Sequence, residues 1–319
     1  MKLNSSNMMC LMFMILSTAM SLMANNWLFM WILMEVNLFM FIPLMSKNKI
    51  NDQSIKYFII QSFSSHLLIF SILMTSIFMT PSKSSMLVLA SLLIKIGMAP
   101  FHTWMPEIMT KLMWNECFLL TSLLKITPMI LINKMLTFKM TLIPMVMSLI
   151  LGSVSGFNQL SMKKLMAFSS IFNLSWMLSA FYLSKKILIL FLIIYSTLNF
   201  KIMSFFKKMN IFYKNQINYL EFYKKLKINL SILSLMGLPP LMGFFPKWMI
   251  LKEIAPKSIF LMLIMILTSL ASMFMYVQIN SFSLSNLTMK KKSFTNNKLK
   301  YFQLINLIFI PVVFLAWWN

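Results

Sequence analysis

The stretch LVLASLLIKIGMAPFHTWMPEIM, residues 87–109, decides how this chain folds. It begins as an apolar run that could enter a membrane, yet it carries Lys95 in its interior. Gly97 and Pro100 follow the lysine, and a proline removes an amide and clashes with the carbonyl four residues earlier. Unwound backbone at membrane depth is tolerated only beside protein or a water-filled cavity. The stretch therefore predicts a transmembrane helix that is interrupted beside a polar site.

A second stretch, MGLPPLMGFFPKWM at residues 236–249, repeats this combination in the other half of the chain. Its prolines and glycines predict another interrupted helix, and it carries Lys247. Two interrupted spans that each bear a lysine indicate inverted repeats with an ion pathway near the midplane of the membrane. Alternatively, Lys247 lies near the end of its span and reaches the head groups.

Composition places the whole chain in lipid. Of its 319 residues, 59% are hydrophobic and 11% are charged, whereas soluble domains carry about 25% charged residues. In lipid every backbone amide must be paired within its own segment unless a barrel closes. We therefore expect an all-α, polytopic membrane protein, with residues 1–319 forming a single transmembrane domain.

Apolar runs and their breakers predict about eleven spans, at about 20 residues per crossing. The first half, 1–139, and the second half, 140–319, share them, and the polar stretch 207–227 is expected to lie at the membrane surface. The expected limits are 5–24, 27–45, 56–79, 85–105, 116–136, 140–158, 164–183, 187–206, 228–248, 257–280 and 301–318.

The lysines predict the orientation. With these spans, 18 lysines fall on the side of the N-terminus and 7 on the other side. By the positive-inside rule the N-terminus then lies in the matrix and the C-terminus in the intermembrane space. Because the lysines form short runs between apolar stretches, they fit anionic head groups better than nucleic acid, in spite of a net charge of +23.

Composition also indicates where the gene resides. The basic residues are all lysine, and the chain has 36 methionines. This bias fits A+T-rich drift in a code that reads ATA as methionine, so we expect a mitochondrially encoded protein of the inner membrane. The N-terminus enters an apolar span from Met8 without an arginine-rich presequence.

Four charges stand near the middle of predicted spans: Glu35, Lys95, Lys125 and Lys247. Each costs about 2.5–3.5 kcal/mol at the centre of a helix, and intramembrane ionisable residues are functional by default. Desolvation disfavours a charged lysine and a nearby carboxylate favours it. Buried lysines with one glutamate can therefore exchange protons, and His102, which follows the first interruption, is a possible relay.

Other polar residues have simpler explanations. Lys201 can extend to the membrane surface, and His66 is either a hydrogen-bonded structural residue or a relay member. Glu107, Lys111 and Glu116 fall near span ends and are expected to be interfacial or entry-site residues.

The two interrupted stretches, with WILMEVNLFMFIPLM (31–45) and NQLSMKKLMAFSSI (158–171), resemble the family of mitochondrial NADH dehydrogenase subunit 2 over nearly the whole chain. This family is an antiporter-like membrane subunit of respiratory complex I. Animal members lack three N-terminal helices of their bacterial relatives, which suits eleven spans.

The resemblance implies a proton pathway, with Glu35 as its glutamate. It places Lys95 in the first broken helix, Lys125 in the helix that follows and Lys247 in the second broken helix. One position departs from the family, because Asn173 stands where a histidine is usual. Asparagine cannot titrate, so a water molecule would have to replace the histidine in a relay there.

We expect no cofactor and no metal in this chain, since two histidines and two isolated cysteines cannot hold haem, copper or iron–sulfur clusters. NADH, FMN, iron–sulfur clusters and ubiquinone are expected on other subunits. Expected partners are the other membrane-arm and accessory subunits of complex I and phospholipids including cardiolipin. The alternatives are a stand-alone cation/proton antiporter and a purely structural spacer.

Overall fold

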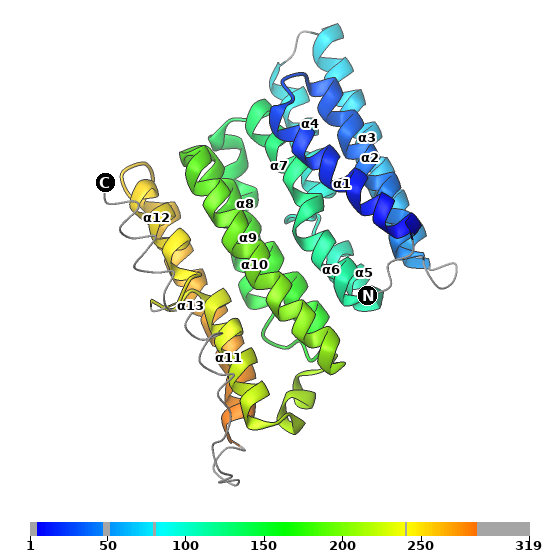
Figure 1. Cartoon of the computed structure of the whole chain (residues 1–319). Helices are drawn as coiled ribbons and strands as arrows, with labels where there is room; N and C mark the ends of the chain where they lie inside the picture. Colours follow the sequence, from blue (N-terminus) through cyan, green and yellow to red (C-terminus); the bar gives the residue numbers. More distant parts are fainter. Residues whose placement is uncertain (1–4, 47–51, 79–80, 240, 286–319) are drawn as a thin grey trace. The chain divides into compact units, whose positions relative to one another are not determined.

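A computed structural model describes residues 5–46, 52–78, 81–239 and 241–285. Within these residues the chain is helical and has no strand; a single isolated bridge joins Ser161 and Tyr213. Contacts divide the chain into two compact units (Figure 1). The first comprises residues 1–151 and 166–178, and the second comprises residues 152–165 and 179–319.

The first unit contains the N-terminal helices. Helix α3 packs along α4, and α1 packs along α2, while α7 contacts α1, α2 and α4. Helix α8 lies mostly in this unit, and the middle of α9 belongs to it as well. The bounds are α1 Ser5–Met23, α2 Trp27–Met45, α3 Asp52–Phe78, α4 Pro81–Ile96, α5 Trp104–Lys111, α6 Trp114–Thr121, α7 Leu123–Met135, α8 Phe138–Val154 and α9 Met162–Leu183.

The second unit contains the C-terminal helices together with both ends of α9. Helix α10 contacts α11 and α12, and α13 contacts α11, α12 and the 3-10 helix η1. The bounds are α10 Lys185–Met209, η1 Lys214–Tyr219, α11 Phe222–Met236, α12 Phe244–Ile254 and α13 Ile259–Ser285.

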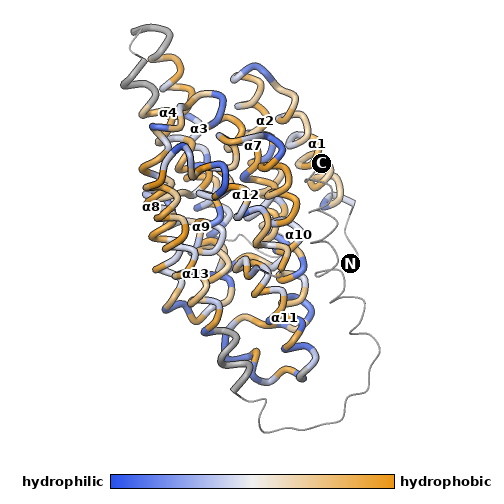
Figure 2. The backbone as a smooth tube through the Cα atoms, turned by 90° about the vertical axis from the view of Figure 1, so that its left-hand side faces the viewer, coloured by the Kyte–Doolittle hydropathy of each residue, from blue (hydrophilic) through white to orange (hydrophobic). Residues whose placement is uncertain are grey.

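The helices have the length and polarity of membrane spans. Seven segments in the described part are long and apolar enough to cross a bilayer, which makes the chain a multi-pass membrane protein. Figure 2 shows apolar residues along the helices and hydrophilic ones at several turns. The span expected at 301–318 lies outside the described residues.

The first proline- and glycine-rich stretch separates α4 from α5. Helix α4 ends at Ile96, and Gly97 follows with φ +72°. The Met98 amide donates to the Leu93 carbonyl at 3.1 Å, which closes the helix as glycine C-caps do. A Cβ on Gly97 would lie 2.9 Å from Cζ2 of Trp104, so both the backbone angle and the space require glycine.

The second such stretch separates α11 from α12 in the other unit. Gly237, at φ +84°, ends α11, and α12 begins at Phe244. A Cβ on Gly243 would lie 1.8 Å from the Ser234 carbonyl oxygen. The backbone that enters α12 therefore lies directly against the last turn of α11.

The polar segment 207–227 contains the end of α10, η1 and the start of α11. Backbone hydrogen bonds tie it to the start of α9: the Met162 amide donates to the Phe212 carbonyl at 2.8 Å, and the Lys214 amide donates to the Leu160 carbonyl at 3.1 Å. Burial lowers the pKa of Lys214.

Candidate functional site

The centre of the site is an ion pair between two helices of the first unit. Lys95 Nζ, one residue before the end of α4, donates to Glu35 Oε1 of α2 at 3.1 Å. The side chains are 4% and 17% exposed, respectively. A buried carboxylate and ammonium are retained in apolar surroundings only when each has a partner. The two mid-span charges thus stabilise each other.

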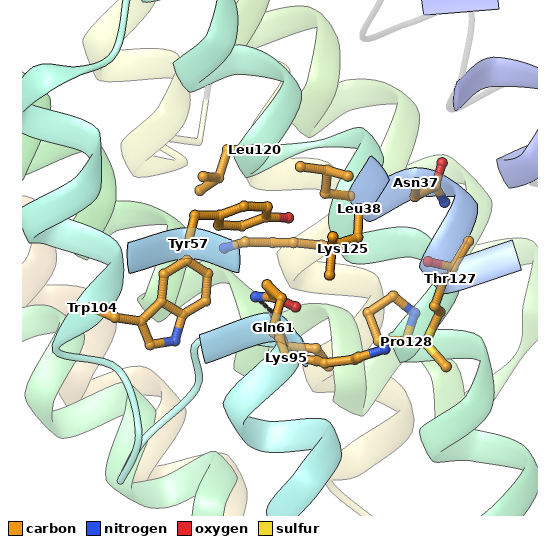
Figure 3. Close-up of a pocket in the computed structure, with 13 residues that line it drawn as sticks. Asn37, Leu38, Tyr57, Gln61, Lys95, Trp104, Leu120, Lys125, Thr127 and Pro128 are labelled. Carbon is orange, nitrogen blue, oxygen red and sulfur yellow. Dashed lines mark hydrogen bonds between the residues drawn. The ribbon is translucent and has the colours of Figure 1, made fainter. Parts of the chain in front are cut away.

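A small cavity lies beside this pair, and Lys125 lies across it. The volume in which the centre of a water molecule can lie is about 30 Å³. One water molecule needs about 10–15 Å³ of such volume. The cavity therefore has room for roughly two waters. The two lysines extend in opposite directions, Lys95 toward α2 and Lys125 toward α5 (Figure 3). The lining residues are Met34, Asn37, Leu38, Tyr57, Gln61, Lys95, Ile96, Trp104, Leu120, Leu124, Lys125, Thr127 and Pro128.

Lys125 is 4% exposed and lacks a carboxylate within ion-pair distance among the described residues. Its Nζ contacts Met105 Sδ at 3.6 Å, and a thioether is only a weak acceptor. Pro128 lies one turn further along α7. Lys95 thus has a carboxylate partner, and Lys125 has none among the described residues. The two lysines lie in unlike environments on the two sides of a space with room for water.

Polar groups continue beyond Met105 within the same unit. Ser170 Oγ, on α9, lies 3.6 Å from Met105 Sδ and donates to the Ala167 carbonyl at 2.6 Å. One turn on, Asn173 Nδ2 donates to the Ser169 carbonyl at 2.9 Å. Asn173 is buried, so the asparagine that departs from the family pattern lies in the interior of the protein.

Side chains add hydrogen bonds to carbonyls at the end of α4. Trp104 Nε1 donates to the Ile94 carbonyl at 3.1 Å, which also accepts from the Gly97 amide at 3.2 Å, and Gln61 Nε2 of α3 donates to the Lys95 carbonyl at 3.1 Å. The indole and the amide thus supplement the backbone hydrogen bonds where the helix ends. They also hold the end of α4, and with it Lys95, against the cavity.

Lys247 belongs to the second unit and has a different environment. Its Nζ donates to the Met236 carbonyl at 3.0 Å and to the Leu235 carbonyl at 3.4 Å. These oxygens terminate α11, where the helix dipole favours a cation. The residue is 7% exposed, so Lys247 is a buried charge that caps the end of α11.

The remaining candidates lie away from the cavity. His102, in the turn between α4 and α5, is half-buried and places Nδ1 3.2 Å from the Pro100 carbonyl. His66 is exposed, and its Nδ1 lies 2.6 Å from the Ser62 carbonyl of its own helix. Glu116, expected at an interface, is 4% exposed and accepts from the Met113 amide at the start of α6.

Several lining residues were not selected from the sequence as site candidates. Asn37 follows Glu35 by two residues, and Tyr57 and Gln61 lie one turn apart on the buried face of α3. Residues three or four positions apart lie on the same face of a helix. This rule, applied to α3, would have placed Tyr57 and Gln61 on one face and His66 on another. Thr127, two residues after Lys125, gave no such signal.

Comparison with known proteins shows the family to which this chain is similar. Residues 24–274 match the transmembrane family described as NADH:quinone oxidoreductase/Mrp antiporter. The chain is 37% identical to NADH-ubiquinone oxidoreductase chain 2 of Anopheles gambiae, over 94% of this chain and 93% of that one. It is also 37% identical to the protein of that name from Locusta migratoria, over 87% and 85% of the two chains.

Solved structures share the fold. A chain of respiratory complex I from Thermus thermophilus matches with a TM-score of 0.79 at 18% identity, covering 91% of this chain and 72% of that one. A chain of an Mrp complex from a Dietzia species matches with a TM-score of 0.73 at 13% identity, covering 90% and 61%. The expected helical, antiporter-like fold is confirmed. From its sequence identities, the chain belongs to the NADH-ubiquinone oxidoreductase chain 2 family.

Proposed function

We propose that this chain moves protons across the mitochondrial inner membrane as a membrane-arm subunit of proton-pumping NADH:ubiquinone oxidoreductase, complex I. The observation that carries the proposal is the Glu35–Lys95 ion pair, with Lys125 across a cavity of water size. Family membership supports the complex, and the buried titratable groups support the task within it.

The proposed transfer starts from the ion pair. When the charge on Glu35 is neutralised or displaced, the ammonium of Lys95 loses the partner that stabilises it, and its proton can pass through water to Lys125. Lys125 has no competing carboxylate in the described part of the chain, so an arriving proton is not trapped. Moving one charge against about 100 mV costs about 2.3 kcal/mol, which is within the range that such changes of environment provide.

Lys247 is proposed to act in the later part of the pathway. Its protonation state would be linked to the end of α11, because the amine donates to the carbonyls there. We propose that α4 with α5, and α11 with α12, each form one interrupted span of inverted repeats. We also propose that the chain has about eleven spans, with the N-terminus in the matrix and the C-terminus in the intermembrane space.

Electron transfer belongs to other subunits in this proposal. NADH, FMN, iron–sulfur clusters and ubiquinone are placed there, and this chain responds to their reaction through the complex. The chain purified alone is expected to oxidise no NADH, and such activity in the isolated chain would contradict this division. Other membrane-arm and accessory subunits are the proposed protein partners. Phospholipids including cardiolipin are the proposed ligands of the lysine-rich segment 207–227.

A stand-alone cation/proton antiporter fits the site less well. Cation sites favour paired acidic residues, whereas the residues that line the cavity include two lysines and no carboxylate. Lysines repel metal ions, so the cavity favours proton transfer over sodium or potassium binding.

The test replaces Lys95 by methionine in the assembled complex. Lys95→Met keeps the length of the side chain and removes its charge, so we expect assembly with loss of coupled proton pumping. Lys139→Met is the control, because Lys139 is exposed at the start of α8. Protons translocated per NADH oxidised are measured in proteoliposomes. Normal pumping by Lys95→Met would remove Lys95 from the pathway.

A further inference from the structure

Asn37 lines the cavity and carries a buried amide nitrogen without a hydrogen-bond partner among the described residues. The residue lies on α2 and is 2% exposed. Its Nδ2 has no hydrogen-bond partner among the described residues, although buried polar atoms are almost always hydrogen-bonded. Because Asn37 lines a cavity with room for roughly two waters, the missing partner is most simply a water molecule.

Ser17 of α1 contacts this amide. Its Oγ lies 2.5 Å from Asn37 Oδ1 and 2.9 Å from the Met14 carbonyl, and its single proton is shared between these two acceptors. Both Ser17 and Asn37 are buried, so one end of the amide is held between α1 and α2. Asn37 and Thr127 lie at the end toward which Lys95 extends (Figure 3).

We propose that Asn37 is a positioning residue that binds a water molecule in this cavity and orients it for proton transfer from Lys95 to Lys125. The inference rests on the proposed function and adds a water site to it. A water oxygen has two lone pairs. When N–H groups of Asn37 and Lys95 occupy both, the hydrogens of the water point onward, toward the side of Lys125.

The transfer balances without a further reactant. An N–H bond of the Lys95 ammonium breaks as its proton joins the oxygen of the oriented water. One of the original O–H bonds of that water then breaks, and its proton reaches the Lys125 nitrogen directly or through the second water. The net change is one proton moved from Lys95 to Lys125, with water restored.

The test compares Asn37→Leu with Asn37→Ser in the assembled complex. Leucine has a similar size but no polar group, so we expect coupled turnover to fall about three- to tenfold, the effect of losing one hydrogen bond, with a changed solvent isotope effect. Serine keeps a donor and leaves room for water, so it should restore most of the activity. Asn199→Leu is the matched control, because Asn199 is 1% exposed and lies on α10 of the second unit.

The outcomes separate this inference from the proposed function. Normal turnover and isotope effect in Asn37→Leu, while Lys95→Met is inactive, would overturn the water site alone. Normal pumping in both variants would overturn the proposed function and the inference with it. A map of the intact native complex that resolves waters gives a second readout. A water within hydrogen-bond distance of the Asn37 amide supports the inference, and a dry cavity overturns it even if Asn37→Leu fails to assemble.

Discussion

Replacing Lys125 by methionine should separate stability from function. Methionine fills much of the space of the lysine stem and removes a buried amine that contacts the thioether of Met105. A charged residue at the centre of a helix costs about 2.5–3.5 kcal/mol. Relief of that cost should leave the variant as stable as the native protein, or more stable by up to about 3 kcal/mol.

Proton transfer through the site should nevertheless be lost. Positioned acid–base groups contribute about 10²–10⁴-fold to the steps in which they act, so transfer by this route should fall at least about 100-fold. The assays are the thermal midpoint of the assembled complex and the protons translocated per NADH oxidised in proteoliposomes. Lys139→Met again serves as the control, and NADH oxidation with an artificial acceptor reports on the electron-transfer subunits.

Two results would refute the reasoning. Unchanged proton stoichiometry at normal turnover would show that Lys125 carries no protons. A strongly destabilised complex would show that the amine is needed for packing, which contradicts an environment whose acceptor is only the thioether of Met105. The expected combination, an intact complex that does not pump, is the result that a structural lysine would not give.

Three further predictions follow from other parts of the chain. Gly97→Ala should destabilise the first unit by about 2–3 kcal/mol, because it forces a left-handed backbone angle on alanine and displaces Trp104 from the Ile94 carbonyl. Gly152→Ala in helix α8 is the control. An unchanged thermal midpoint for Gly97→Ala would contradict the steric argument. Lys247→Met should lower the stability of the second unit by about 0.3–2 kcal/mol, because the cation at the end of α11 is lost. Hydrogen exchange at the last turn of α11 should detect the local opening. Native protection from exchange there would contradict the capping role. Because burial lowers the pKa of Lys214 below its ordinary value of 10.5, the unfolded state binds more protons between the folded pKa and 10.5, and the contribution of this residue to stability rises with pH in that window. Lys214→Met should therefore raise the thermal midpoint near pH 7, and the gain should shrink as the pH approaches 10.5; a gain independent of pH would exclude this linkage.

Sequence alone predicted the elements that depend on local chemistry. Apolar runs predicted helices, and the positions of Gly97 and Pro100 predicted where helical structure ends near Lys95. These inferences depend on backbone pairing in lipid and on steric limits, which act within a few residues of the chain.

Sequence could not predict which charges meet, because that depends on how helices pack. Glu35 and Lys95 are 60 residues apart, yet their side chains form an ion pair. His66 stood out chemically, but it faces outward, while Gln61 on the same helix reaches the cavity. Lys247 was expected to be either a pathway residue or a snorkelling one, and its contact with the Met236 carbonyl at the end of α11 depends on packing that the sequence does not show.

The glycines of the two interruptions have a genetic consequence. Every glycine codon begins with two guanines, so the A+T-rich drift expected from the composition would remove glycine readily; the chain has five glycines. Three of them, Gly97, Gly237 and Gly243, stand where a Cβ meets a ring or backbone, or where φ is positive. Under the mutational bias expected from the composition, a single base change at these codons would damage the scaffold while leaving every titratable side chain in place. The mutations most harmful to proton transfer in this chain therefore include ones that alter no acid and no base.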